Sequence, residues 1–425
     1  MNYKSLASCA IALVLAYGQA PNVVTASPES EHSAKTPSVN LAKAKKAFEH
    51  CSFAEVTRLL AKDNSEEGFF LQARAVEIVR SGDASFFYLR ASQIAPTPLK
   101  EVYKALALLS STRSSSALDV LRPIYARYPS NPEVMSTYGR CLCTADQSEK
   151  GRELMRVARL KDPKSEICSD NLSNVAKLNF AVSDALESLG RDIAAKPHSV
   201  PLRLRRAIVF SESGQLKESL GDFDAALKEN PDCQYTYYQR ATVYRNMQKY
   251  DKAIADLVRS EQCPEKDRLV SQRVLRLKVD CEDQSHHVSS AVADSRALID
   301  SYRGLKLSRG MRADILHRVT LLEKQNQCDA ALKALQPMMH DYSDRSEVLT
   351  VQARLLGKLK RYKESLAIAD KLVARDNEMW EWHQIRGLAL AGLGDTTRAE
   401  HEFAQAKSLK SEYSDLPQQL RERIK

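Results

Sequence analysis

Four prolines recur at a spacing of 34 residues, and this spacing constrains the fold more than any other feature of the sequence. The four are Pro129, Pro163, Pro197 and Pro231, with no insertion between them. A fixed period in this range indicates stacked two-helix repeats, in which each unit buries its apolar face against its neighbours. Proline lacks a backbone donor and disfavours helix in the residue before it, so each proline ends the second helix of a unit. The spacing predicts a helical solenoid.

The chain aligned on these prolines forms four contiguous units with one internal pattern. The units are 98–131, 132–165, 166–199 and 200–233. A small or apolar residue stands at the eighth place of every unit, where the first helix must let the second approach closely: Ala105, Gly139, Ser173 and Ala207. The second helices carry the complementary stripe, clearest at Phe223 and Ala226. This periodicity predicts antiparallel helix pairs.

These places resemble the motif of the tetratricopeptide repeat family, which has small residues at places eight, twenty and twenty-seven, apolar or aromatic residues at eleven and twenty-four, and proline at thirty-two. Unit 200–233 carries Ala207, Phe210, Gly214, Phe223, Ala226 and Pro231, with Ser219 where alanine is usual. Units 234–266 and 380–413 match as well, although Pro264 comes one place early and Ser411 replaces the last proline. The resemblance implies an all-α fold, a right-handed α-solenoid of about ten antiparallel helix-pair repeats.

The sequence divides into six predicted segments. They are a signal peptide (1–26), a flexible lead-in (27–40), an N-terminal repeat array (41–266), an oversized repeat (267–311), C-terminal repeats (312–413) and a capping helix (414–425). The oversized repeat is about eleven residues too long. We expect this surplus to divide between the turn at CEDQSHH and the tail RGLKLSRG.

The first residues are typical of an export signal. Lys4 precedes an apolar run from Leu6 to Tyr17, and small residues end at Ala26. The run is shorter than the roughly eighteen residues needed to span a bilayer, and the segment after it suits cleavage. The sequence therefore predicts a secreted or periplasmic protein, with membrane anchoring by an uncleaved signal as the alternative.

Charge and motifs argue against several functional classes. The chain has 63 Lys and Arg against 54 Asp and Glu, and these charges are scattered rather than clustered. Nucleic-acid binding usually needs a concentrated basic face, so no nucleic-acid partner is expected. We find no phosphate loop, no G-x-S-x-G elbow and no H-E-x-x-H motif, and repeats leave no stretch for a catalytic domain. The sequence predicts no enzyme, no cofactor and no metal site.

A polar strip on the first helices is the candidate binding surface. Places two, five, nine, twelve and thirteen of the first helices line the inner groove of such a solenoid. They hold Arg140, Asp170, Asn174, Lys177, Tyr235, Tyr238, Thr242, Arg245 and Lys278. These amides, cations and tyrosines suit an extended peptide, including an acidic one. The alternative is an ordinary solvated helix face. Leu204 and Ile208 do not support the lysine and asparagine carboxylate clamp that some family members carry.

Three arginines at place seven are each followed by an acid sixteen residues later. The pairs are Arg206 with Asp222, Arg240 with Asp256, and Arg386 with Glu402. These places lie at similar heights on the two helices of a pair, so they predict structural ion pairs between helices. A ligand role for the arginines is the alternative.

The chain has nine cysteines. If the chain is exported, some of them are candidates for disulfide bonds, because oxidising compartments favour disulfides. Antiparallel packing brings Cys233 and Cys263 to the same end of a helix pair, and Cys281 and Cys328 lie near turns of adjacent repeats. Both pairs are candidate disulfides, and a bond to Cys168 from Cys141 or Cys143 is another. The alternative for each cysteine is a small buried hydrophobic side chain.

The sequence as a whole predicts a non-enzymatic protein-interaction scaffold of the exported or envelope compartment. Its partners would be other proteins or peptides held in the concave groove. The alternative is an accessory subunit of an envelope enzyme complex, or a hydrolase with a site built in the groove. The fold alone does not choose among partners, and self-association stays open.

Overall fold

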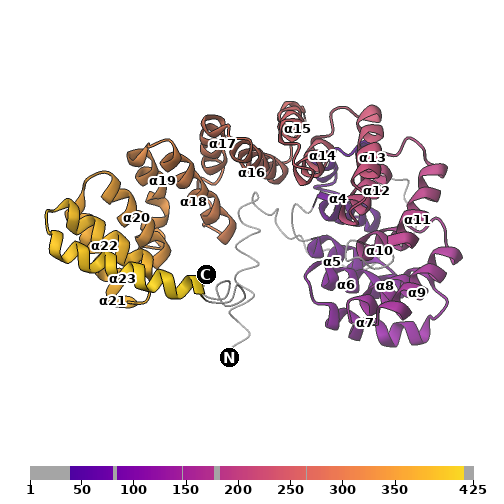
Figure 1. Ribbon diagram of the computed structural model, residues 1–425. Coiled ribbons are helices and arrows are strands. Elements are labelled where there is room, and N and C mark those ends of the chain that lie inside the picture. Colours follow the sequence, from indigo (N-terminus) through magenta and orange to yellow (C-terminus); the bar gives the residue numbers. More distant parts are fainter. Residues whose placement is uncertain (1–38, 80–83, 146, 177–181, 265, 416–425) are drawn as a thin grey trace. The chain divides into compact units, whose positions relative to one another are not determined.

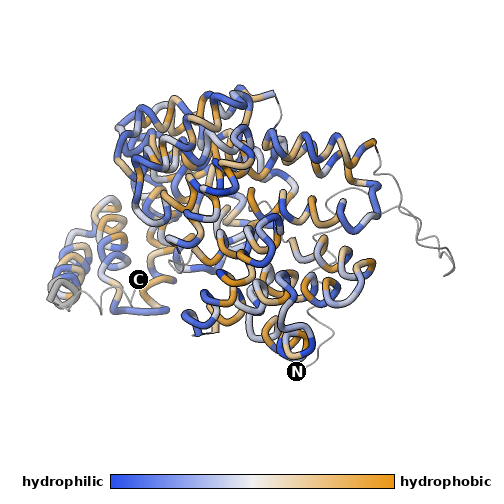
Figure 2. The backbone as a smooth tube through the Cα atoms, turned by 90° about the vertical axis from the view of Figure 1, so that its right-hand side faces the viewer, coloured by the Kyte–Doolittle hydropathy of each residue, from blue (hydrophilic) through white to orange (hydrophobic). Residues whose placement is uncertain are grey.

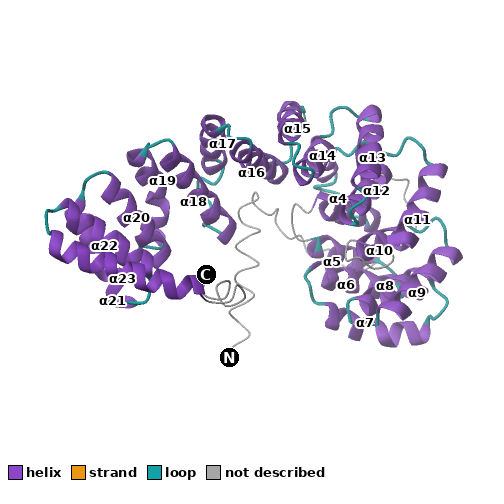
Figure 3. Ribbon diagram, in the orientation of Figure 1, coloured by secondary structure: helices purple, strands orange, loops and turns teal. Residues whose placement is uncertain are grey.

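The computed structural model describes residues 39–79, 84–145, 147–176, 182–264 and 266–415. These residues form helices joined by short loops, with no strand in any of the described ranges (Figure 3). The predicted signal peptide, most of the lead-in and most of the capping segment lie outside them. From Asn40 onward the helices belong to one compact unit.

The helices follow one another in pairs along the chain (Figure 1). The first half comprises α2 (Val39–Glu49), α3 (Phe53–Leu59), α4 (Glu66–Val79), α5 (Ser85–Ile94), α6 (Leu99–Ser110), α7 (Ser114–Arg127), α8 (Pro132–Cys143), α9 (Ser148–Lys161), α10 (Glu166–Ala176), α11 (Val182–Ala195), α12 (Val200–Glu212) and α13 (Leu216–Glu229). The second half comprises α14 (Gln234–Asn246), α15 (Tyr250–Gln262), α16 (Arg268–Gln284), α17 (Val288–Asp300), α18 (Arg309–Lys324), α19 (Cys328–Asp341), α20 (Ser346–Lys358), α21 (Tyr362–Arg375), α22 (Trp380–Gly392) and α23 (Thr396–Asp415).

In most pairs the first helix packs on the second, and the second packs on the first helix of the next pair along the chain. The most extensive contacts join α8 to α9, α12 to α13, α14 to α15 and α22 to α23. Apolar and polar residues alternate around each helix, so that one side is buried and the other is solvated (Figure 2). The predicted all-α solenoid is confirmed.

The turn inside most pairs uses one residue with positive φ, which is the second residue after the last residue of the first helix. The non-glycine examples are Cys51, Thr112, Gln248, His286, Asn326 and Lys360, with φ between 57° and 63°. Gly214 and Gly394 occupy the same position in their pairs, with φ of 80° and 87°. Glycine adopts this conformation without the steric conflict that a Cβ atom brings. The shared turn keeps the helix pairs in one geometry.

Close backbone contact fixes the pair α8 and α9. A Cβ atom at Gly139 would lie 2.5 Å from the carbonyl oxygen of Gly151, and one at Gly151 would lie 2.4 Å from that of Gly139. Neither position therefore has room for a side chain. Gly139 stands at place eight, where the sequence predicts a close approach of the two helices.

At place twenty, two pairs have a serine whose hydroxyl bonds to the backbone of the facing helix. Ser219 Oγ donates to the carbonyl oxygen of Ala207 at 2.7 Å, and Ser365 Oγ donates to that of Ala353 at 2.8 Å. Both serines are fully buried. The serine that departs from the family motif is therefore accommodated because its hydroxyl bonds to the facing helix.

The surplus of the oversized repeat lies partly where it was expected. The turn between α16 and α17 has only the three residues from Ser285 to His287, like the other turns, so the expectation of a long turn there was wrong. Instead α16 begins early, because the Asp267 side chain caps it by accepting from the backbone N–H groups of Leu269 and Val270 at 2.8 and 2.9 Å. The remaining surplus is the segment 301–308 before α18.

The N-terminal helices pack against repeats much further along the chain. One buried core joins Phe48, Val56 and Ile78 to Leu204 and Ala241. Arg273 of α16 also donates to the carbonyl oxygen of Val79, at 2.5 Å. Helices α2 to α4 therefore cover part of the first-helix face of the central repeats.

Candidate functional site

The predicted groove is filled in its central part by the chain's own helices. Asp170 and Tyr235 are 7% and 4% exposed. Phe53 of α3 contacts Tyr235 edge to face, with ring centroids 6.5 Å apart. Asp170 and Tyr235 thus lie beneath α2 to α4 rather than on an open surface, because the apolar faces of those helices require a partner.

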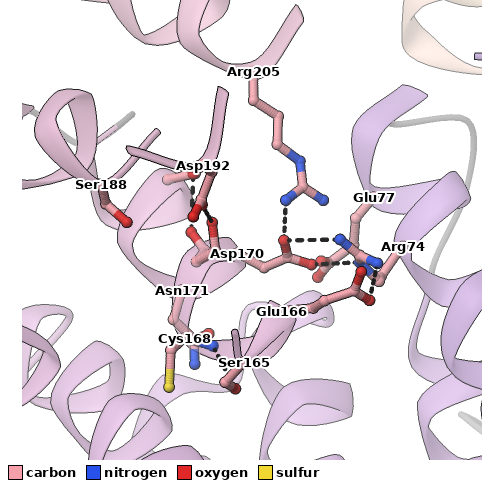
Figure 4. Close-up of polar contacts among 12 residues, drawn as sticks. Arg74, Glu77, Ser165, Glu166, Cys168, Asp170, Asn171, Ser188, Asp192 and Arg205 are labelled. Carbon is pink, nitrogen blue, oxygen red and sulfur yellow. Dashed lines mark hydrogen bonds and ion pairs between the residues drawn. The ribbon is translucent and has the colours of Figure 1, made fainter. Parts of the chain in front are cut away.

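Arg74 of α4 is the polar centre of this contact (Figure 4). Its Nε donates to Asp170 Oδ2 at 2.8 Å, and a second nitrogen bonds to Glu166 at the start of α10. Arg205 of α12 bonds to the other oxygen of Asp170. Arg74 also lies over the ring of Phe48, with 4.9 Å between the guanidinium carbon and the ring centroid. One arginine thereby ties α4 to α10, and through Asp170 to α12.

The charges in this cluster balance. Burial alone would raise the pKa of Asp170, but the guanidinium groups of Arg205 and Arg74 outweigh burial and hold that pKa below its ordinary value. Asp170 is therefore ionised at neutral pH and is saturated by two cations. A carboxylate in this state is a structural anchor and has no free capacity for a ligand.

The remaining groove residues of α8 and α10 are also engaged within the chain. Arg140 donates to Asn171 Oδ1 at 3.2 Å. Asn174 borders a small cavity of about 20 Å³ that Ile78 and Arg205 also line. Lys177 lies outside the described residues.

The groove residues of α14 and α16 have mixed surroundings. Tyr238 is half-buried, Thr242 donates to the carbonyl oxygen of Tyr238 at 3.0 Å, and Arg245 is exposed. Arg245 forms an ion pair with Asp280 at 2.9 Å. Lys278 is largely buried between helices. Among the predicted groove residues that the structure describes, Arg245 is the one exposed cation.

Lys278 belongs to a carboxylate cluster between α15, α16 and α17. Its Nζ pairs with Glu261 at 2.8 Å and with Asp294 at 3.0 Å. Glu282 is 4% exposed, and its Oε2 has no hydrogen-bond partner in the described part of the chain. Burial, and then the neighbouring Asp294, raise the pKa of Glu282 to about 8.

The three place-seven arginines lie against the acids sixteen residues later. Arg206 Nε donates to Asp222 at 2.6 Å, Arg240 to Asp256 at 2.8 Å and Arg386 NH2 to Glu402 at 2.5 Å. Each contact joins the two helices of one pair. These acids are buried, with exposed fractions of only 5%. The arginines therefore act as inter-helix links.

The eight cysteines of the described residues are all buried free thiols. They are Cys51, Cys141, Cys143, Cys168, Cys233, Cys263, Cys281 and Cys328. The pairs Cys233–Cys263 and Cys281–Cys328 are not bonded here and stay predictions. Cys233 instead has a hydrogen bond to the thiol of Cys51.

Two clefts lie beside α2. The larger has a volume of about 480 Å³ and lies between α2, α4 and the starts of α8 and α10. Its lining includes the rings of Phe48 and Phe70 and a mixture of acidic and basic side chains: Lys45, Glu49, Glu67, Arg74, Glu133, Glu166 and Lys196. Lys45 and Glu67 form an ion pair in this lining. Its charges are largely paired.

The second cleft, of about 400 Å³, lies between α2, α3 and the loops after α13 and α15. Lys43 and Lys46 of α2 line it, together with His50 in the turn after α2 and the acids Glu55 and Asp232. Lys43 and Lys46 are exposed and have no ion-pair partner among the described residues. This cleft thus carries two lysines without an ion-pair partner beside the acids Glu55 and Asp232, and we call it the α2 lysine cleft.

Comparisons with known proteins agree with the repeat pattern. Residues 204–267 and 350–411 match the tetratricopeptide repeat family. These two stretches are tetratricopeptide repeats. That fold is generally a protein-interaction scaffold and is generally non-enzymatic. No curated protein matches the sequence.

Several solved structures are similar to this chain. A tetratricopeptide repeat protein from Parabacteroides merdae is 15% identical, with a TM-score of 0.36, over 61% of this chain and 98% of that one. A thermophilic tetratricopeptide repeat protein from Thermus thermophilus is 18% identical, with a TM-score of 0.33, over 42% and 96%. The human IFIT1 dimer with PPP-AAAA is 13% identical, with a TM-score of 0.34, over 86% and 99%.

Within the ranges that the structure describes, no three His, Cys, Asp or Glu side chains are grouped to hold a metal ion. None of the described helices has the length and apolar character to cross a bilayer.

Sequence reasoning missed the docking of α2 to α4. One signal was available: Arg74 is the one basic residue in the largely apolar run GFFLQARAVEIV, whose other charge is Glu77, and a charge that becomes buried needs a partner. Nothing in the sequence identified that partner as Asp170. The α2 lysine cleft was missed for the same reason, because it exists only after α2 has docked.

Proposed function

We propose that the chain is a protein-interaction scaffold that holds acidic peptide segments of its partners in the α2 lysine cleft. The observation that carries this proposal is the pair of exposed lysines, Lys43 and Lys46, beside a cleft of about 400 Å³. Complementary charge of this kind selects acidic partners and speeds their association. The proposed binding surface therefore lies beside α2 and not in the groove that the sequence predicts.

The geometry also gives the cleft an apolar component. Ala47, Leu59 and Pro264 line it together with the charged groups. A peptide with an acidic residue next to an aliphatic one would therefore satisfy both parts. Burying one aliphatic side chain contributes about 1.5–3 kcal/mol, which the charged contacts supplement with specificity.

Binding of short fluorescent peptides to the full chain tests this proposal. The peptides carry a central leucine flanked by glutamate, serine or lysine, and polarisation reports binding. We expect the glutamate peptide to bind best, and the double variant Lys43→Glu/Lys46→Glu to weaken its binding by about tenfold or more. The matched control is Lys333→Glu/Lys371→Glu, which makes the same charge change at exposed positions on α19 and α21.

Equal loss in both double variants would show a general charge effect and contradict a site. Preference for the lysine peptide would contradict the proposed partner class. Helical circular dichroism of each variant checks that folding is intact.

We propose further that this scaffold works in the exported or envelope compartment. The support is the N-terminal pattern of Lys4, the apolar run and the small residues that end at Ala26. Determining the N-terminal residue of the mature protein from its native source tests this. A terminus after Ala26 is expected, and an intact Met1 would contradict cleavage.

A further inference from the structure

Two thiols that are far apart in the sequence meet where α3 joins the repeat array. Cys51 lies in the positive-φ turn after α2, and Cys233 is the N-cap residue of α14, 182 residues later. Cys233 Sγ lies 4.0 Å from the carbonyl oxygen of Cys51, and the two thiols share a hydrogen bond. We propose that Cys51 and Cys233 form a reversible disulfide that fastens α2 and α3 to the central repeats.

The site favours Cys233 as the attacking thiolate. Thr236 Oγ1 donates to Cys233 Sγ at 2.9 Å. The Cys51 thiol, the Thr236 hydroxyl and the backbone N–H groups of Thr236 and Tyr235 together hold the pKa of Cys233 below its ordinary value. A thiolate at a helix N-terminus gains from the free N–H groups and the helix dipole. Cys233 is thus positioned as the nucleophile of the pair.

Cys51 has the complementary character. Burial, and then its hydrogen bond to Cys233, raise the pKa of Cys51 well above the ordinary value of a thiol. Cys51 therefore keeps its proton while Cys233 reacts. This makes Cys51 the resolving thiol, which acts once the Cys233 sulfur has become part of a mixed disulfide.

The proposed oxidant is a small-molecule disulfide. The Cys233 thiolate attacks one of its sulfurs, forms a mixed disulfide and releases one thiolate. Cys51 then loses its proton and attacks the Cys233 sulfur, which forms the protein disulfide and releases the second thiolate. The two protein thiols lose two protons and two electrons, and the oxidant becomes two thiols.

Access controls the rate of this exchange. Cys51 and Cys233 are 6% and 2% exposed, so a small-molecule disulfide reaches them when α2 and α3 separate from the array. Helix α3 has only seven residues, and isolated helices this short are unstable without tertiary contacts. Once formed, the disulfide closes a loop of the chain and prevents that separation.

The pairing differs from Cys233–Cys263, which the sequence suggested. Cys263 packs with Leu227 and Tyr237 in a separate small cluster, and its thiol donates to the carbonyl oxygen of Arg259 at 3.5 Å. One sulfur cannot form both bonds. The two pairings therefore compete, and peptide mapping separates them.

The test incubates the full chain with glutathione disulfide, blocks free thiols, digests with trypsin without reduction and identifies linked peptides. Trypsin places Cys51 in 47–58, Cys233 in 229–240 and Cys263 in 260–266. We expect 47–58 linked to 229–240, with reversal by excess reduced glutathione. The matched control is the variant Cys263→Ser, which should keep this link.

Single variants test the two roles. Cys51→Ser should trap glutathione on Cys233, whereas Cys233→Ser should leave Cys51 unmodified under the same conditions. Tryptic cleavage of the native chain after Lys43 and Lys46 should also slow by about tenfold on oxidation, because α2 no longer separates.

Several outcomes would overturn the proposal. They are a link between 229–240 and 260–266, free thiols at both Cys51 and Cys233 after prolonged exposure, or glutathione on both residues of the parent chain. The inference does not depend on the proposed function, because the link is measured without any peptide ligand.

Discussion

Arg74 Nε lies 2.8 Å from Asp170 Oδ2, and this ion pair joins α4 to α10 across 96 positions of the chain. Asp170 also accepts from Arg205, so one carboxylate connects three helices. A buried charge that loses its partner is strongly unfavourable. The cluster therefore makes the docked position of the N-terminal helices specific.

Replacing Arg74 with methionine is expected to lower the free energy of unfolding by about 3 kcal/mol, because Asp170 and Glu166 lose a buried cation. Urea unfolding followed by circular dichroism measures this. The control Arg58→Met breaks an exposed pair with Glu55 and should cost less than about 1 kcal/mol. Equal effects of the two substitutions would contradict a special role for the buried pair.

Gly139→Ala is expected to destabilise the chain by about 1–3 kcal/mol, because the new Cβ would lie 2.5 Å from the carbonyl oxygen of Gly151. Gly221→Ala in α13 is the matched control, since nothing lies within 4 Å of its new Cβ. That control should be neutral or stabilising by up to about 1 kcal/mol through helix propensity. Thermal melts of both variants give the comparison, and a neutral Gly139→Ala would refute the close contact.

Gln248→Gly is expected to stabilise the chain by about 1 kcal/mol, because Gln248 has a φ of 58° that glycine adopts freely. Glycine also raises the conformational entropy of the unfolded chain, which offsets part of this gain in stability. Lys371→Gly, within α21, should instead cost about 1 kcal/mol. Urea midpoints distinguish the two, and destabilisation by both would show that the turn is not strained.

The pKa of Glu282, which is raised to about 8 from its ordinary value of 4.5, makes stability depend on pH. The folded chain keeps a proton that the unfolded chain loses between these values. This contribution is therefore fully present below about pH 4.5 and is lost as the pH rises to about 8. The slope from one such proton is at most about 1.4 kcal/mol per pH unit.

Glu282→Gln is expected to remove this slope, because glutamine stays neutral at every pH. Urea midpoints measured across the same range test it, with the exposed Glu400→Gln as control. A parent chain and Glu282→Gln variant with parallel pH profiles would show that Glu282 titrates normally.

The sequence predicts the structure within each helix pair well, because equivalent places in successive units make the same helix–helix contacts. Gly139 at place eight and Phe223 at place twenty-four follow directly from the 34-residue period. The bond from Ser219 to Ala207 could not be read from that period, since it depends on how closely the two helices pack.

Contacts between distant repeats were not predictable in the same way. The sequence pattern predicts that α4 has an apolar face, but it does not predict which surface of the solenoid covers that face. The choice of Asp170 as the partner of Arg74, and of Tyr235 as the neighbour of Phe53, depends on how the pairs curve. That curvature is a sum of small rotations, none of which a single residue type specifies.

The packing of α2 and α3 on α14 sets the order of events during synthesis. Cys51 leaves the ribosome 182 residues before Cys233. At about 5–20 residues per second, this delay is roughly 10 to 40 seconds. For that time α2 and α3 lack their contacts with α14, such as that of Phe53 with Tyr235, although α4 to α13 can already stack. The nascent chain is therefore most prone to aggregation before α14 emerges, and a chaperone that holds its first helices would act in this interval.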